Sequence, residues 1–120
     1  MKFTWVTFHI SDMEKSLSFY RDLLGLKIVR DFGDENQRIV FLAGDNETQV
    51  ELICNKGESV ENYGKGMSIG FGVTGLEGKI ADLKNKVSAP IVGPISPNPQ
   101  IKFYFVPDPD GYAIQLYESL

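Results

Sequence analysis

The sequence has few of the residues that would make a membrane, disulfide-bonded or nucleic-acid-binding protein. No apolar run approaches the roughly 18 residues of a membrane span, and the first eight residues, MKFTWVTF, lack the long apolar stretch of a secretory signal. Cys54 is the only cysteine, which excludes an intrachain disulfide. Acidic residues outnumber basic ones by 16 to 12 without any basic cluster, which argues against a nucleic-acid partner. We therefore expect a cytoplasmic protein with neither a membrane nor a nucleic-acid partner.

Two stretches of the chain repeat each other. FHISDMEKSL begins at residue 8 and FGVTGLEGKI at residue 71, an offset of 63, while QVEL and AIQL further along match at an offset of 64. In both copies a hydroxyl residue precedes a glutamate by three positions, Ser11 before Glu14 and Thr74 before Glu77. This spacing predicts a capping box at the start of a helix in each copy. The repeat predicts a duplicated unit that could not bury its apolar face alone.

Hydrophobic periodicity and turn residues predict the order strand, helix and three strands in each half. We expect strands at 4–10, 26–30, 38–43 and 49–54 with a helix at 13–24, and then strands at 68–73, 101–106 and 112–117 with a helix at 76–87. Gly25 is placed to end the first helix in the left-handed conformation, and Asp110 and Gly111 to form the last hairpin turn. Four prolines between residues 88 and 100 exclude a helix there and leave one short edge strand and a long loop. We expect one domain over residues 1–120, with modules at about 1–55 and 68–120 and a linker at 56–67.

Two segments of the chain carry a family resemblance. SDMEKSLSFYRDLLGLKI is similar to the first helix of the vicinal oxygen chelate superfamily, and FVPDPDGYAIQLYE is similar to its closing hairpin. That superfamily includes glyoxalase I, bleomycin resistance proteins and ring-cleaving dioxygenases. The resemblance implies an α+β fold in which two βαβββ modules form an incomplete barrel around a cup, and it implies a homodimer.

The resemblance assigns four cup-facing positions to the metal ligands of the metal-dependent relatives. They fall on Trp5, Glu51, Ser68 and Gln115, of which only Glu51 is a good match. An indole has no lone pair for a metal, and the amide of Gln115 has no basic site where the related lyases use a carboxylate as general base. We therefore expect no cofactor and no metal, and the pattern argues against glyoxalase I chemistry. A divalent metal (Zn, Ni, Co, Mn or Fe) held by the oxygens of Glu51 and Gln115 is the alternative.

The expected cup carries aromatic and polar side chains that suit a small molecule. The candidate ligand-binding residues are Trp5, Thr7, His9, Ser68, Tyr104, Gln115 and Tyr117. Gly70 and Gly72 fall on the same face and could leave room for a ligand. His9 and Glu51 are the candidate catalytic residues, since an imidazole or a carboxylate can move a proton. His9 lies four residues beyond Trp5, about 13 Å along the strand, and so cannot replace it as a metal ligand.

Two classes of function remain open. We favour metal-independent binding of a small aromatic or amphipathic molecule, as in a drug-sequestering resistance protein or a small-molecule sensor. The alternative is an enzyme of the same superfamily. It would be a divalent-metal-dependent lyase (lactoylglutathione lyase-like), isomerase or dioxygenase, or would use Glu51 or His9 alone as an acid or base.

Overall fold

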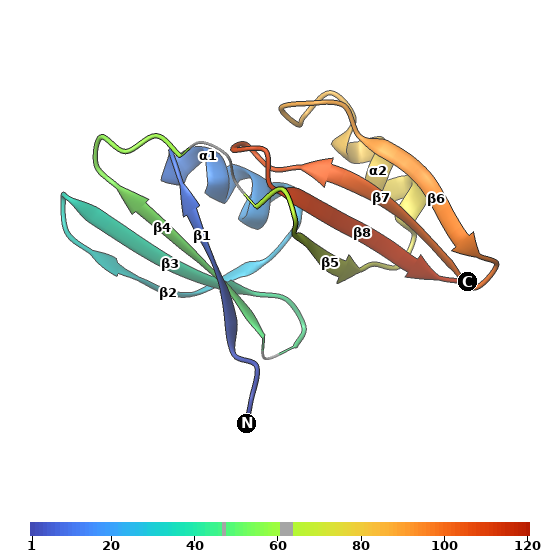
Figure 1. Cartoon of the computed structure of the whole chain (residues 1–120), viewed down its shortest axis with the longest axis horizontal. Coiled ribbons are helices and arrows are strands. Elements are labelled where there is room, and N and C mark those ends of the chain that lie inside the picture. The colour runs from blue at the N-terminus through green and yellow to red at the C-terminus, as the bar shows by residue number, and fades with distance from the viewer. Residues whose placement is uncertain (47, 61–63) are drawn as a thin grey trace. The chain divides into compact units, whose positions relative to one another are not determined.

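The computed structural model describes residues 1–46, 48–60 and 64–120, and the chain divides into two compact units, Met1–Glu61 and Asn62–Leu120 (Figure 1). Each unit holds one four-stranded mixed sheet, and within the described residues neither sheet closes into a barrel. Strand, helix and three strands follow one another in both units, so the predicted α+β fold of two βαβββ modules is confirmed. The linker expected at 56–67 includes residues 61–63, which lie outside the described residues, and the expected module boundaries stay a prediction.

The first unit forms a sheet in which distant strands are neighbours. It contains β1 (Trp5–Ile10), helix α1 (Met13–Leu17) with its π-helical continuation η1 (Ser18–Leu23), β2 (Lys27–Gly33), β3 (Gln37–Ala43) and β4 (Gln49–Asn55). The strand order is β1-β4-β3-β2, with β1 parallel to β4 and the other pairs antiparallel. Gly25, at φ 83°, follows the helical segment in the left-handed conformation, as predicted.

The second unit has the same topology. It contains β5 (Ser68–Gly72), helix α2 (Leu76–Leu83), β6 (Val92–Asn98), β7 (Ile101–Pro107) and β8 (Ala113–Ser119), in the sheet order β5-β8-β7-β6. Helix α2 ends four residues before the expected position 87, because Lys84 is extended and Asn85 has a positive φ of 68°. The expected short edge strand is the seven-residue β6, whose pairing with β7 is interrupted by register shifts. None of the helices in the described residues is long and apolar enough to cross a membrane.

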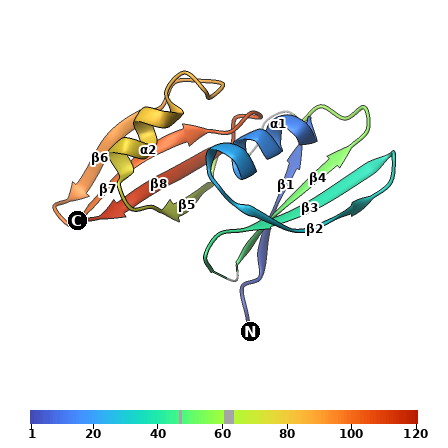
Figure 2. The same ribbon diagram turned by 180° about the vertical axis from the view of Figure 1, so that it is seen from behind.

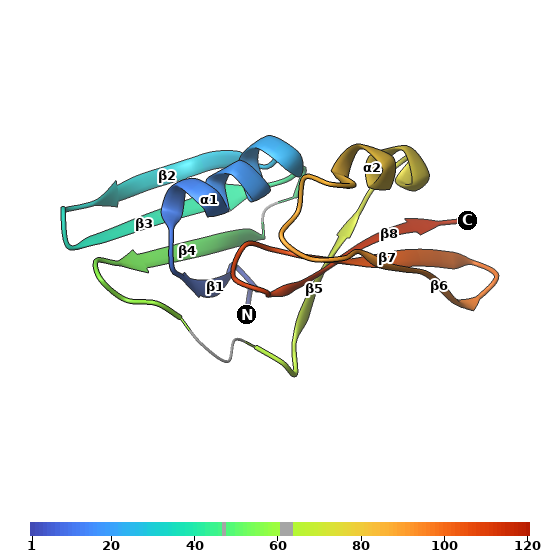
Figure 3. The same ribbon diagram turned by 90° about the horizontal axis from the view of Figure 1, so that it is seen from above.

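One face of each sheet is apolar and is covered by the helix of the same unit (Figure 2, Figure 3). Alternation along the strands buries Phe8, Ile10, Val40, Leu42, Val50 and Leu52 in the first unit, and Tyr104, Val106, Ile114 and Leu116 in the second. Burying each side chain of this size contributes roughly 1.5–3 kcal/mol to folding. The opposite face of each sheet, which we call its open face, is not covered by the helix of its own unit. Side chains on the strands that could contact a ligand therefore lie on the open faces.

Neither predicted capping box forms. Asp12, not Ser11, caps α1, and its Oδ1 accepts a hydrogen bond of 3.1 Å from the amide of Lys15. Helix α2 begins after Gly75, which is left-handed at φ 72°. Both helices therefore begin at the expected residues 13 and 76, but each N-cap lies one residue later than the predicted capping box required. The glutamate of each repeat is consequently at the second helical position, from which it cannot reach back as a capping box requires.

A carboxylate from outside the helix caps α2 instead. Glu118, near the end of β8, accepts hydrogen bonds of 2.8 Å from the amide of Gly75 and 3.1 Å from the amide of Leu76. These two backbone donors hold the pKa of Glu118 below its ordinary value. The cap joins the first turn of α2 to the strand β8, a contact that the local sequence of the helix does not reveal.

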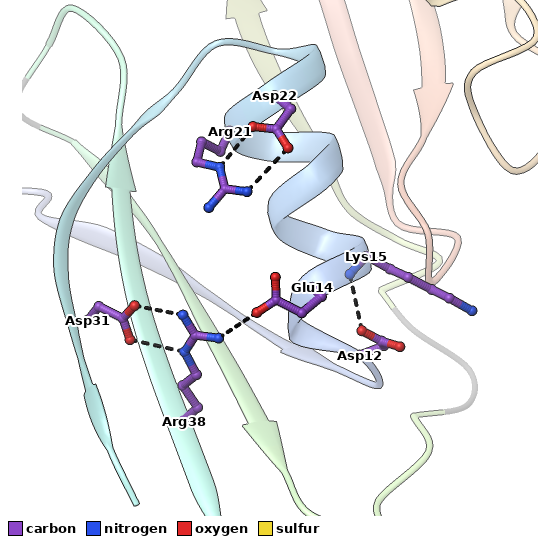
Figure 4. Close-up of polar contacts among 7 residues, drawn as sticks. All are labelled: Asp12, Glu14, Lys15, Arg21, Asp22, Asp31 and Arg38. Atoms are coloured by element: carbon purple, nitrogen blue, oxygen red, sulfur yellow. Dashed lines mark hydrogen bonds and ion pairs between the residues drawn. The ribbon is translucent and has the colours of Figure 1, made fainter.

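The two glutamates instead form the same ion pair in both units, joining the helix to the third strand of its unit. Glu14 pairs with Arg38 of β3 at 2.9 Å, and Glu77 pairs with Lys102 of β7 at 2.9 Å. Arg38 also donates two hydrogen bonds to Asp31 and thereby lowers the pKa of that carboxyl (Figure 4). Since Arg38 and Lys102 are 64 residues apart, this helix-to-sheet ion pair is part of the repeat.

Candidate functional site

The open face of the first sheet carries one continuous row of four unlike side chains. Thr7 of β1 is the partner of Glu51 on β4, Glu51 is the partner of Phe41 on β3, and Phe41 is the partner of Arg30 on β2. Partnered residues of a sheet point to the same face and lie about 4.5–5.5 Å apart. The row therefore brings a hydroxyl, a carboxylate, an aromatic ring and a guanidinium together in that order.

A hydrogen bond orients the carboxylate of this row. The hydroxyl of Thr7 donates to Oε1 of Glu51 at 2.5 Å, and the Glu51 side chain is half-buried. A carboxylate has about four lone-pair sites, so one such bond leaves most of its acceptor capacity available. Glu51, one of the two candidate catalytic residues, is thus an oriented acceptor, while its catalytic role stays a prediction.

Two aromatic rings and one guanidinium cluster around Phe41, the neighbour of Glu51 in the row. The ring of Phe41 is 2% exposed and forms the floor, with the edge of Trp5 at 5.5 Å and the stacked ring of Phe32 at 6.3 Å between centroids. Trp5 and Phe32 are 49% and 48% exposed. The guanidinium carbon of Arg30 lies 4.5 Å from the centroid of Phe41 and 5.5 Å from that of Phe32. This distance range is that of cation–π contacts.

Sequence reasoning missed Arg30, Phe32 and Phe41 as members of this surface. Phe41 could have been found, since alternation along the expected strand puts it on the face opposite to Val40 and Leu42, which are buried. Arg30 could not, because a register shift between Ile28 and Arg30 reverses the alternation of β2. Without that bulge Ile28 and Arg30 would point to the same face, whereas the structure pairs Ile28 with Leu42 on the helix side.

His9 lies on the same face as Thr7 and Trp5, two residues beyond Thr7 along β1. It is the partner of Ile53 on β4, and its side chain is exposed. The structure thus brings three of the predicted ligand-binding residues, Trp5, Thr7 and His9, onto one face with Glu51. Contact of any of them with a ligand stays a prediction.

The open face of the second sheet carries three of the other predicted residues, Ser68, Gln115 and Tyr117, whose side chains are neutral. Gln115 is the partner of Gly70, and Tyr117 is the partner of Gly72. A Cβ atom on Gly70 would lie 3.3 Å from Oε1 of Gln115, and one on Gly72 would lie 3.0 Å from the hydroxyl of Tyr117. The two side chains therefore lie over their glycines and take the space that we expected to be left for a ligand. Ser68 is exposed at the start of β5.

Tyr104 does not lie on the open face where its predicted ligand-binding role would require it. It is the partner of the buried Leu116, is 7% exposed, and faces helix α2. Its hydroxyl donates a hydrogen bond to the carboxylate of Glu77, with 2.7 Å and 2.9 Å to the two oxygens, which raises the pKa of Tyr104. Residues Phe103 and Phe105, one position to either side, occupy the open face instead and form an edge-to-face pair at 5.5 Å.

The residues at the four positions assigned to metal ligands are a weak match to a divalent-ion site, and an ion held by Glu51 and Gln115 stays the alternative prediction. The indole of Trp5 has no lone pair in the ring plane to donate, Ser68 is a neutral hydroxyl and Gln115 a neutral amide. Glu51 is the only anionic donor among them, and it accepts a hydrogen bond from Thr7. Among the residues that the structure describes, no group of three or more His, Cys, Asp and Glu side chains is placed to hold a metal ion.

Comparison with known proteins gives concordant matches in sequence and structure. The family model described as Glyoxalase/Bleomycin resistance protein/Dioxygenase superfamily matches residues 2–116. A probable lactoylglutathione lyase of a Synechocystis species is 32% identical over 92% of this chain and 89% of its own, and the lactoylglutathione lyase of Haemophilus influenzae is 28% identical over 92% and 87%.

Two solved structures show the same fold. The trypanothione-dependent glyoxalase I of Leishmania major matches with a TM-score of 0.82 and 28% identity, over 98% of this chain and 86% of that one. TnmS3, an antibiotic-binding protein from a Streptomyces species, matches with a TM-score of 0.78 over 100% and 97% of the two chains. At 20% identity the likeness to TnmS3 is one of fold alone.

Proposed function

The chain belongs to the glyoxalase/bleomycin resistance protein/dioxygenase superfamily, and we propose that within it the protein binds a small aromatic or amphipathic molecule without a metal centre. The proposed site is the open face of the first sheet. One observation carries the proposal. Trp5 stands where the family resemblance assigns a metal ligand, and it packs edge-on against Phe41, beside the half-exposed Phe32.

The aromatic surface is large enough to hold a flat ligand. An aromatic side chain has about 150–250 Å² of surface, so the two half-exposed rings of Trp5 and Phe32 together offer roughly 200 Å². At about 25 cal/mol per Å², covering them contributes about 5 kcal/mol before the cost of association. Polar contacts from Thr7, His9 or Glu51 would then fix the orientation of the ligand. In most small-molecule sites the apolar lining covers the ligand, and a few polar groups set its orientation and the specificity.

An enzymatic function is the second candidate, and sequence similarity favours it. The relatives that the chain resembles at 28–32% identity are named as lactoylglutathione lyases. In such an enzyme Glu51, oriented by the hydroxyl of Thr7, would be the group that accepts a proton from the substrate. Gln115, at the equivalent position of the second unit, could hydrogen-bond a substrate but could not accept a proton near neutral pH.

Metal content and the spectroscopic signals of Trp5 distinguish the two candidate functions. Trp5 is the only tryptophan, so its fluorescence and its single indole N–H resonance report on the proposed site alone. We expect protein purified without chelator to contain no stoichiometric metal, and a screen of aromatic compounds to shift the Trp5 resonance. Stoichiometric nickel, cobalt or zinc that is lost in Glu51→Ala would refute the metal-free proposal.

Conversion of a bound compound into a product further distinguishes an enzyme from a binding protein. If a compound from the screen is converted, Glu51→Gln should abolish conversion and retain affinity in an enzyme, whereas a pure binding protein shows no conversion in either form. Thr7→Val, which removes the hydroxyl that orients Glu51, should slow any such conversion. Thr48→Val is its matched control, because Thr48 hydrogen-bonds only weakly, at 3.4 Å, to the carbonyl of Phe3.

We further propose that the protein is cytoplasmic, as its composition led us to expect, and that it is a homodimer, as the family resemblance implies. Light scattering at micromolar concentration tests the oligomeric state, and a mass near the 13.4 kDa of one chain would contradict a dimer.

A further inference from the structure

The row Thr7, Glu51, Phe41, Arg30 carries a carboxylate on one side of Phe41 and, on the other, an arginine whose guanidinium lies over the Phe41 ring. We infer that the ligand is a flat molecule with an anionic group at one end, bound by Arg30, and an ammonium or other N–H donor at the other end, bound by Glu51. This inference rests on the proposed function, because it specifies the ligand of the same open face. It assigns Arg30 and Glu51 as the residues that determine specificity.

The two charged groups are held apart by the fold. Arg30 and Glu51 lie on strands two positions apart, with β3 between them, so their Cα atoms are separated by about 10 Å. The guanidinium lies over the rings of Phe41 and Phe32, whereas the carboxylate accepts from Thr7. Among the described residues, no ion pair joins Arg30 to a carboxylate. A ligand that lies on this face, against the exposed rings of Trp5 and Phe32, can therefore meet both charges.

The contact of Arg30 with two aromatic rings prepares it for an anion. A guanidinium carries five N–H donors in one rigid plane. Those donors match the two oxygens of a carboxylate, or of a sulfonate or phosphate group, in a bidentate arrangement. The contact with Phe41 and Phe32 also restricts the Arg30 side chain, which reduces the entropy that binding would otherwise cost.

The carboxylate fixes the direction of the ligand. Glu51 attracts a cationic or N–H group and repels an anionic one, so a ligand with an acid at one end binds with that end toward Arg30. The hydroxyl of Thr7 holds one oxygen of Glu51 and leaves the remaining lone pairs for the ligand.

The second unit is an internal comparison. The equivalent row there is Gly70, Gln115, Phe105 and Val92, which keeps the aromatic floor and has no charge. Two sheets of the same topology thus differ at both ends of the row. The charge pair is consequently a property of the first unit and not a requirement of the fold.

A rigid, elongated molecule with a carboxylate at one end and an ammonium group at the other tests the inference. The probe is 4′-(aminomethyl)biphenyl-4-carboxylate, and three analogues replace the carboxylate by carboxamide, the aminomethyl group by methyl, or both. Affinities are measured by calorimetry on the whole chain, and the Trp5 indole resonance locates binding. The variants are Arg30→Gln and Glu51→Gln. Arg21→Gln is the control, because Arg21 lies on the helical segment and pairs with its neighbour Asp22.

We expect the carboxylate to improve affinity about fivefold over the carboxamide in the wild type, the scale of an exposed ion pair of about 1 kcal/mol. That preference should vanish in Arg30→Gln and persist in Arg21→Gln. The preference for aminomethyl over methyl should vanish in Glu51→Gln alone. Equal affinities for charged and uncharged analogues, with the Trp5 resonance still shifted, would overturn this inference. The proposal that the open face binds aromatic molecules would still hold. Failure of all four probes to shift Trp5 would overturn the proposed function as well.

Discussion

The hydrogen bond between Thr7 and Glu51 should be measurable as an energy of coupling between two neighbouring strands. Thr7→Val replaces the hydroxyl by a methyl group of similar size and keeps the β-branched shape that suits β1. Glu51→Ala removes the acceptor from β4. Because the two residues are direct partners in parallel strands, the loss of one should remove most of the stabilising effect of the other.

The expected magnitude follows from exposure. A hydrogen bond to a charged group contributes about 1.5–3 kcal/mol where water is excluded. Thr7 is exposed and Glu51 is half-buried, so solvent screening reduces the value to about 0.5–1 kcal/mol. The strand propensities of the substituted residues affect single and double variants alike and cancel in the cycle.

The free energies of unfolding of the wild type, the two single variants and the double variant are measured by urea titration. We expect a coupling energy of about 0.5–1 kcal/mol, with Thr48→Val in place of Thr7→Val giving a value near zero. Thr7→Val should also weaken the selectivity for an aminomethyl group in the biphenyl series, since Glu51 is then no longer oriented. Additive effects of Thr7→Val and Glu51→Ala would refute the view that this hydrogen bond positions the carboxylate.

Three further outcomes follow from contacts on the helix side of the sheets. Arg38→Met should lower the free energy of unfolding by about 1 kcal/mol, since Arg38 is 37% exposed and joins two carboxylates, whereas Arg21→Met should have no measurable effect in the same urea titration. Tyr104→Phe should lower the melting temperature at pH 7 and leave ligand affinity unchanged; a loss of affinity would return Tyr104 to the binding site. The pKa of Glu118 lies below its ordinary value of 4.5 in the folded protein, so its stabilising effect is complete above that pH and disappears as the pH falls through the lowered pKa. Thermal unfolding between pH 7 and 2 should therefore show a smaller loss of stability in Glu118→Gln than in the wild type, and parallel curves would contradict the cap.

The architecture was accessible from the sequence because it depends on patterns that repeat. Alternating apolar residues marked the strands, and the offset of 63 to 64 residues marked two equivalent units. Turn chemistry was equally local. Gly25 and Gly111 have the positive φ values of 83° and 95° that their positions in the pattern required.

Helix caps and strand faces were less accessible, although the first residue of each helix was predicted correctly. The capping boxes were wrong because Asp12 caps α1 and Glu118, on the distant strand β8, caps α2. Glu14 and Glu77 pair instead with basic residues of the sheets. Tyr104 was assigned to the wrong face although alternation with Phe103 and Phe105 contained the information.

The sequence by itself determined that two βαβββ units exist, because the repeat depends on residue type and spacing alone. The residues Trp5 and Gln115 at two of the positions that the resemblance assigns to metal ligands were read from the same source, and the absence of a metal there stays a prediction. Only the tertiary structure placed Arg30 in the same row as Glu51. That placement depends on a bulge in β2, which reverses the side of the sheet to which every later residue of the strand points. A local change of register of this kind leaves no mark in the hydrophobic pattern, and it decides which charges meet on the open face.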